Sequence, residues 1–294
     1  MMQRTLIAVL GLLSAHLLLA QDPFVEALRR YQSGELAQAR ALIEEAVTSP
    51  AHEEDPEAWL LRGFVYKDLY KGAAGTKEGD QAREEALASL LTCMGYDPLG
   101  TYKDNAVQAY DYLTRSSFNE AAKALNEGDE ERAVRLFGKY KEAVLRTDPK
   151  ADLKAREIEF TNALGTVYTK RFNQDRTRTE WFEKAVATYK EVLVMDPANY
   201  GANYNLATLY YNRGVYNIRQ ISAVDDIPGM QQVQAVSREF FQLALPYMLV
   251  AHDMNPTRRE TLLGLEGIYY SLQDQVNSDK FRELFELLPP EQDR

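Results

Sequence analysis

The sequence is poor in the side chains that most often carry chemistry. It contains one cysteine, Cys93, and three histidines in 294 residues. A single cysteine cannot form an internal disulfide, and its position on the apolar face of an expected helix indicates a small core residue. His52 and His252 are the histidines beyond the first twenty residues, and neither has a second His or a Cys at metal-ligand spacing. The acidic residues at 53–55 leave metal binding by His52 open as an alternative to a solvated connection.

Recognised catalytic motifs are also missing. The sequence has no phosphate-binding glycine loop, nucleophile elbow or zinc-protease motif. Acidic pairs such as Glu44-Glu45, Glu84-Glu85 and Glu130-Glu131 fall on the polar faces of expected amphipathic helices, which indicates solvated surface rather than paired catalytic carboxylates. The sequence therefore predicts that the protein is not an enzyme and uses no cofactor or metal.

Basic side chains are outnumbered by acidic ones. The chain has 34 Lys and Arg residues against 44 Asp and Glu residues, and its formal net charge is −10. A surface of that sign repels phosphate backbones and anionic lipid head groups. Nucleic acid and acidic membranes are therefore poor partners, and another protein is the expected one.

One long apolar run is present, and it lies at the beginning of the chain. Arg4 precedes the almost wholly apolar stretch Leu6 to Leu19, and Ala20 provides a small residue before the polar Gln21. About 14 apolar residues suit a secretory signal over 1–20 better than a membrane span, which needs roughly 17 to 25. A membrane anchor is the alternative. Removal of 1–20 deletes Arg4 and no acid, so the net charge becomes about −11, and we expect an exported, periplasmic or cell-envelope protein without stable membrane insertion.

The remaining residues repeat a pattern of two amphipathic helices. Leu, Ala, Glu and Lys at helical spacing leave little room for strands, which predicts an all-α chain. Separations of 7, 5 and 7 residues link Ala27, Gly34, Ala39 and Ala46, and the same separations recur from Ala121 to Tyr140. Elsewhere a Tyr follows a small residue by three positions, and a Pro follows an Ala by twelve: Gly63 and Tyr66 with Ala86 and Pro98, Gly165 and Tyr168 with Ala185 and Pro197, Ala207 and Tyr210 with Ala244 and Pro256.

This pattern resembles the tetratricopeptide repeat family, which places a small residue and Tyr on the first helix of a unit and Ala and Pro on the second. The resemblance implies an α-α superhelix of stacked helix-turn-helix units, because each unit buries only one of its faces and needs a neighbour. It covers the chain in about six units, at 22–50, 56–98, 102–149, 155–197, 199–256 and 258–288.

Three units exceed the regular family spacing, by 11, 8 and 25 residues, each at the turn inside the unit. The glycine-rich segment Gly72–Gly79 is expected to form a mobile loop. Over 200–254 the pattern predicts a protruding helical hairpin with a turn at 225–229 and arms of about 24 residues. The helical stretch 102–113 is expected to continue through Ser116-Ser117 into one long helix.

The resemblance also implies a binding surface. First helices of such units line a concave groove that holds an extended peptide or a partner helix. The groove positions carried over by register are Leu60, Phe64, Lys67 and Asp68 in the second unit, Asn162, Thr166 and Lys170 in the fourth, Tyr204, Thr208 and Tyr211 in the fifth, and Leu263 and Tyr270 in the sixth. Tyr211 and Tyr270 are favoured as contacts, because Tyr210 and Tyr269 take the core positions. We therefore predict an exported scaffold for protein-protein interaction; a saccharide carrier or sensor using the groove tyrosines is the alternative.

Overall fold

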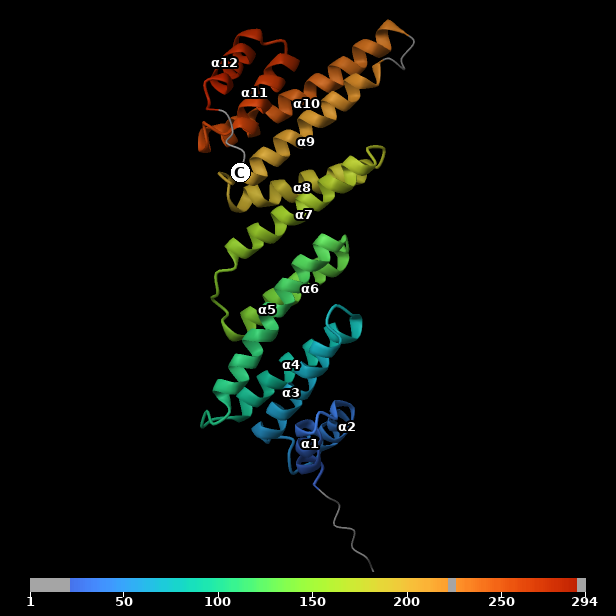
Figure 1. Ribbon diagram of the computed structural model, residues 1–294, viewed down its shortest axis with the longest axis vertical. Coiled ribbons are helices and arrows are strands. Elements are labelled where there is room, and N and C mark those ends of the chain that lie inside the picture. Colours follow the sequence, from blue (N-terminus) through green and yellow to red (C-terminus); the bar gives the residue numbers. More distant parts are fainter. Residues whose placement is uncertain (1–21, 222–225, 290–294) are drawn as a thin grey trace, which may run out of the picture. The chain divides into compact units, whose positions relative to one another are not determined.

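The computed structural model describes residues 22–221 and 226–289, and this part of the chain is made of α-helices without any strand (Figure 1). The expected signal at 1–20 and the start of the expected turn at Asp225 lie outside the described residues. No helix within these ranges is long and apolar enough to cross a membrane.

Consecutive helices form helix-turn-helix units, so the predicted all-α repeat architecture is confirmed. The helices are α1 (Pro23–Gln32), α2 (Leu36–Ala46), α3 (Pro56–Gly72), α4 (Lys77–Tyr96), α5 (Lys103–Glu127), α6 (Glu130–Thr147), α7 (Lys154–Gln174), α8 (Thr179–Met195), α9 (Tyr200–Arg219), α10 (Ile227–Met254), α11 (Arg259–Ser271) and α12 (Gln275–Glu286). As predicted, α5 runs unbroken through Ser116-Ser117.

The chain divides into two compact units within α5, one ending at Ser116 and the other beginning at Ser117. In the first compact unit, apolar residues of α1, α2 and α3 form one buried cluster, which includes Ala39, Ile43 and Val65. In the second compact unit, a cluster that includes Phe137 joins α5, α6 and α7, and a larger one extends from Phe172 to the C-terminal helices.

The two helices of a unit cross closely at a glycine. A methyl group added at Gly63 would lie 2.7 Å from Cδ2 of Leu90, and one added at Gly165 would lie 2.7 Å from Cε1 of Tyr189. Leu90 and Tyr189 are buried, and each follows the repeat alanine of its helix by four residues. Since i and i+4 share a helix face, the repeat pattern places the small residue of one helix directly against a large side chain of the next.

The prediction of a mobile loop over Gly72–Gly79 is wrong. α3 continues to Gly72 and α4 begins at Lys77, so only residues 73–76 connect them. The Thr76 hydroxyl caps α4 by accepting from the backbone N–H of Gly79 at 3.0 Å, and Gly79 packs against the Ala73 carbonyl with no room for a side chain. The glycines therefore permit a tight turn between two lengthened helices.

A buried ion pair stabilises this lengthened end of α4. The Arg83 guanidinium donates to Asp80 at 2.8 Å, and both side chains are less than a tenth exposed. The guanidinium also lies 5.0 Å from the centre of the Tyr70 ring on α3. Because both charges are desolvated, loss of either partner would be far more costly than loss of a surface pair.

The fifth unit is an extended hairpin, as predicted, but its arms are unequal. α9 has 20 residues and α10 has 28, and the two helices lie side by side with their outer ends extending away from α11 and α12 (Figure 1). The residues expected to complete the turn belong instead to α10: Asp226 caps it, and Pro228 occupies its first turn, where a missing N–H costs nothing. Ile218 and Val236, in the outer half of the hairpin, are 38% and 39% exposed.

The glycine crossing can be tested by substitution of Gly165 with alanine. The new methyl would meet the ring of Tyr189, which is 1% exposed and cannot turn aside. We expect Gly165→Ala to destabilise the protein by about 1–2 kcal/mol, because overpacking outweighs the better helix propensity of alanine. Urea or thermal unfolding measures the change.

Gly138 on α6 provides the matched control, since no atom lies within 4 Å of a methyl group added there. Gly138→Ala should stabilise the protein by up to about 1 kcal/mol. Equal effects of the two substitutions would contradict the proposed crossing.

Candidate functional site

On α7, the predicted groove residues Asn162, Thr166 and Lys170 lie one turn apart and therefore on one face. Asn162 is half-buried, and its Nδ2 donates to Oδ1 of Asn199, the N-cap residue of α9, at 3.2 Å. Thr166 and Lys170 are exposed. Asn162 thus links two neighbouring first helices. The Thr166 hydroxyl donates to the Asn162 carbonyl at 3.0 Å, and Lys170 is available to a ligand.

On α9, Tyr204 and Thr208 continue this face. The Tyr204 ring is half-buried and stacks on the parallel ring of Tyr200, with 5.9 Å between the ring centres. The Tyr200 hydroxyl lies 3.0 Å from the hydroxyl of Thr261 on α11, so the stacked pair also connects α9 with the next first helix. Burial raises the pKa of Tyr204, so its hydroxyl is a neutral hydrogen-bonding group.

The two favoured tyrosines have different surroundings. Tyr211 packs against α11, where a methyl group at Gly267 would lie 2.8 Å from its hydroxyl oxygen, and its ring lies 5.7 Å from that of Phe241. Tyr270 is 67% exposed, and Leu263 on the same helix is 47% exposed. Tyr211 has a packing role in addition to any contact with a ligand, whereas Tyr270 and Leu263 present their side chains to solvent.

The predicted groove positions of the second repeat belong to the first compact unit. Leu60 is buried there, and Asp68 accepts a hydrogen bond from the Tyr31 hydroxyl at 2.8 Å. The Lys67 ammonium lies 4.2 Å from the centre of the Phe64 ring, and burial lowers its pKa. Lys67 and Phe64 therefore satisfy each other, which leaves little of either for a ligand.

A pocket of about 560 Å³ lies beside Tyr270 in the second compact unit, and we call it the hairpin pocket. Its lining comes from α9, α10, α11 and the start of α12: Val215, Ile218, Arg219, Phe241, Tyr270, Ser271, Gln273 and Gln275. Of these, only Tyr270 was among the predicted contacts. The others lie outside the groove register of the family, and no local motif marks them, so sequence reasoning missed them.

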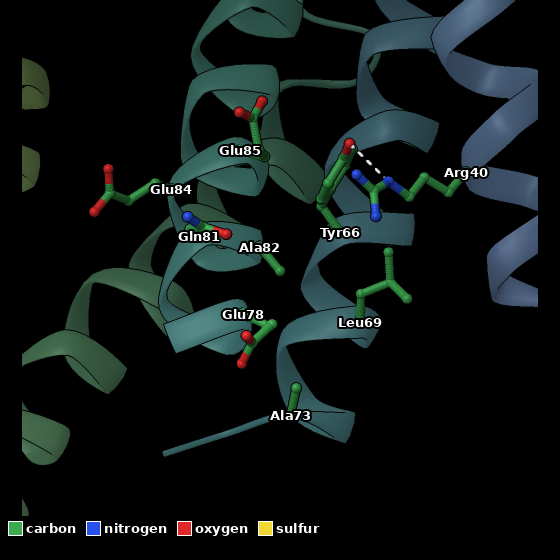
Figure 2. Close-up of a pocket in the computed structure, with 9 residues that line it drawn as sticks. All are labelled: Arg40, Tyr66, Leu69, Ala73, Glu78, Gln81, Ala82, Glu84 and Glu85. Carbon is green, nitrogen blue, oxygen red and sulfur yellow. Dashed lines mark hydrogen bonds between the residues drawn. The ribbon is translucent and has the colours of Figure 1, made fainter. Parts of the chain in front are cut away.

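Figure 2 shows a second pocket, of about 420 Å³, in the first compact unit between α2, α3 and α4. Arg40 Nε donates to the Tyr66 hydroxyl at 3.2 Å, and that hydroxyl donates to Glu44 at 2.7 Å. Exposed Glu78, Glu84 and Glu85 also line it. Arg40 and Tyr66 are hydrogen bonded to each other, and Glu85 accepts from the Arg62 guanidinium at 2.8 Å, so these lining groups already have partners within the protein.

Cys93 and His52 both have structural roles. Cys93 is fully buried, and burial, with Asp97 and Asp55 nearby, raises the pKa of its thiol to about 11, which disfavours the nucleophilic thiolate. In the described ranges no group of three His, Cys, Asp or Glu side chains is arranged to hold a metal ion. His52 instead joins two helix ends: its Nδ1 lies 3.1 Å from Asp55, the N-cap of α3, and its Nε2 lies 3.0 Å from Asp22, the N-cap of α1.

No protein-family model and no curated protein sequence matches the chain. Among solved structures it is similar to a monomeric mutant of IFIT1 with Gppp-AAAA, at a TM-score of 0.40, and to a second monomeric mutant of IFIT1 with m7Gppp-AAAA, at 0.41. Both alignments have 15% identity and cover 90% of this chain and 59% of the IFIT1 chain. The chain thus spans less than two thirds of the length of these proteins, and a likeness at this level carries no information on its ligand.

The His52 bridge predicts a pH-dependent stability. Burial lowers the pKa of His52, but hydrogen bonds and charge interactions with Asp55 and Asp22 outweigh it, and the net shift is upward. The charged bridge therefore stabilises the folded state below the ordinary histidine pKa of about 6.5, and the stabilisation disappears as the pH rises through the raised value.

We expect His52→Gln to cost about 1 kcal/mol at pH 5.5 and less at pH 8.5, as measured by urea unfolding. Asp22→Asn is the control variant, because asparagine retains the cap but removes one negative charge, and it should reduce the pH dependence. A cost that is the same at both pH values would contradict a charged bridge.

Proposed function

We propose that the chain is an exported scaffold of the periplasm or cell envelope that binds another protein on one face of the second compact unit. We call this the first-helix face and define it by Asn162, Thr166, Lys170, Tyr204, Thr208, Leu263 and Tyr270. The observation that carries the proposal is that α7, α9 and α11 contact one another in order and are linked by the Asn162–Asn199 and Tyr200–Thr261 hydrogen bonds. The face is thus preformed before a partner arrives.

The chemistry of the first-helix face suits a protein surface. Leu263 and Tyr270 supply exposed apolar and aromatic area, and Thr166 and Lys170 supply exposed polar groups. Interfaces between proteins combine aromatic and apolar anchors with a polar surround. Binding to helices that are already held together avoids the cost of ordering them, so a passive recognition mechanism suffices without catalysis.

Charge introduced at Leu263 tests the first-helix face. We expect Leu263→Glu to reduce recovery of a specific partner from an envelope extract by about tenfold, because burial of an unpaired carboxylate in an interface costs at least the corresponding 1.4 kcal/mol. The measurement is quantitative mass spectrometry of proteins captured on the immobilised chain.

Val194→Glu is the matched control, since Val194 is 83% exposed on α8, a second helix, and undergoes the same chemical change. A partner lost with Leu263→Glu and retained with Val194→Glu supports the first-helix face. If both variants recover every protein equally well, the face is not the binding surface.

Export is tested separately with the full-length chain. We expect the protein from the envelope fraction to begin at or near Gln21, as measured by mass spectrometry of its N-terminal peptide, and a chain lacking 2–20 to remain in the cytoplasm. Recovery of envelope protein that retains residues 1–20 would instead indicate the membrane anchor.

A further inference from the structure

The lengthened fifth unit builds the hairpin pocket. Val215, Ile218 and Arg219 lie near the outer end of α9, and Phe241 lies on α10, three residues before the repeat alanine Ala244. Phe241 is 4% exposed, and a methyl group at Gly214 would lie 2.5 Å from its ring. Tyr270, at the end of α11, lines the pocket as well. The lengthened hairpin thus contributes side chains of α9 and the buried ring of Phe241 to the pocket.

Two of the five polar lining side chains already form hydrogen bonds within their own helices. The Ser271 hydroxyl donates to the Gly267 carbonyl at 2.8 Å, and the Gln275 amide donates to Asp279 at 2.8 Å. The Arg219 guanidinium and the Gln273 amide have no hydrogen-bond or ion-pair partner among the residues that the structure describes. These two groups, together with the hydroxyl of the exposed Tyr270, are therefore the donors that a bound molecule would find.

Gln273 adopts a backbone conformation that glycine would adopt more easily. Its φ is +66°, and it alone among the described non-glycine residues has a positive φ. At the corresponding turn, after the first helix, the first and third repeat units have Gly34 and Gly128, with φ of +76° and +79°. A left-handed conformation strains any residue with a Cβ, and such strain is concentrated at functional sites. Here the strained residue contributes an amide that glycine would lack.

The backbone carbonyls just before Gln273 are already hydrogen bonded, so they do not repel a bound anion. The N–H groups of Leu272, Gln273 and Asp274 donate to the carbonyls of Ile268, Tyr270 and Tyr269 at 2.9–3.0 Å, which satisfies the last acceptors of α11. The Asp274 carboxylate is turned to Asn277, whose backbone N–H and side-chain amide it accepts from. Among the lining residues that the structure describes, none is acidic and Arg219 is the one charged side chain.

We propose that the hairpin pocket binds a small monocarboxylic acid with an apolar body, such as a medium-chain fatty acid. The Arg219 guanidinium is suited to a carboxylate, to which it donates charge-assisted hydrogen bonds, and the Gln273 amide adds a neutral donor. Val215, Ile218, Phe241 and Tyr270 provide the apolar contact. The volume of about 560 Å³ falls in the range of roughly 300–1,000 Å³ that is usual for small-molecule sites.

Isothermal titration calorimetry of the whole protein tests the site, with octanoate below its micelle concentration as the probe. We expect saturable one-to-one binding of octanoate, at least tenfold weaker binding of 1-octanol, which lacks the charge, and no measurable binding of acetate, which lacks the apolar body. Equal binding of octanoate and octanol, or no saturation by octanoate, would overturn the proposal.

Two variants locate the binding within the pocket. Arg219→Gln, at an exposed position, should weaken octanoate binding at least tenfold and leave the melting temperature unchanged. Gln273→Gly should weaken it about threefold while raising the melting temperature by about 2–4 °C, because the strain is relieved. A lower octanoate affinity together with a higher melting temperature distinguishes a ligand contact from a general loss of structure. Octanoate affinity that is unchanged in both variants would place the ligand elsewhere and refute the site.

The hairpin pocket shares Tyr270 with the first-helix face, but other residues allow the two proposals to be tested separately. Leu263→Glu should reduce capture of the partner and leave octanoate binding unchanged. Arg219→Gln should weaken octanoate binding and leave capture of the partner unchanged. Loss of octanoate binding in Leu263→Glu, with its fold intact by circular dichroism, would refute the assignment to the hairpin pocket.

Discussion

The close approach of paired helices at a small residue is the constraint on which the second compact unit depends. Gly165, Gly214 and Gly264 each face a large side chain of a neighbouring helix, respectively Tyr189, Phe241 and Met248. The first two contacts close hairpins, and the third joins α10 of the fifth unit to α11 of the sixth. One packing rule therefore serves both within a unit and between units, which is why a series of short amphipathic helices can share a continuous core.

This constraint also determines what an insertion becomes. Once two helices are aligned at the crossing, extra residues on either side can satisfy their backbone groups by continuing both helices, whereas a long loop would need other partners. The second repeat unit has lengthened helices joined by a four-residue turn between α3 and α4. The fifth repeat unit has the long arms of the hairpin. Inserted residues thus lengthen a rigid surface, and in the fifth unit they create a pocket.

Helix order and core positions could be predicted because they follow from periodicity and from the spacing of small residues, Tyr and Ala. The turn at 73–76 could not, because glycine content alone does not distinguish a flexible segment from one where Thr76 caps a helix and Gly79 fits against a carbonyl. The hairpin pocket was also beyond prediction: Arg219 and Gln273 are far apart in the sequence and belong to no common motif. Their proximity depends on where α9 ends relative to the turn after α11.

Net charge and local charge have different consequences for recognition. A protein of net charge −10 repels anions at long range, but at physiological ionic strength charges beyond roughly 8 Å are largely screened, so Arg219 dominates inside the hairpin pocket. The guanidinium supplies charge-assisted hydrogen bonds to a carboxylate, and apolar area supplies the rest of the affinity. Small hydrophilic anions would gain only the contribution of the guanidinium. The combination of an acidic surface, one arginine and an apolar wall would therefore favour amphiphilic acids over inorganic and polar anions.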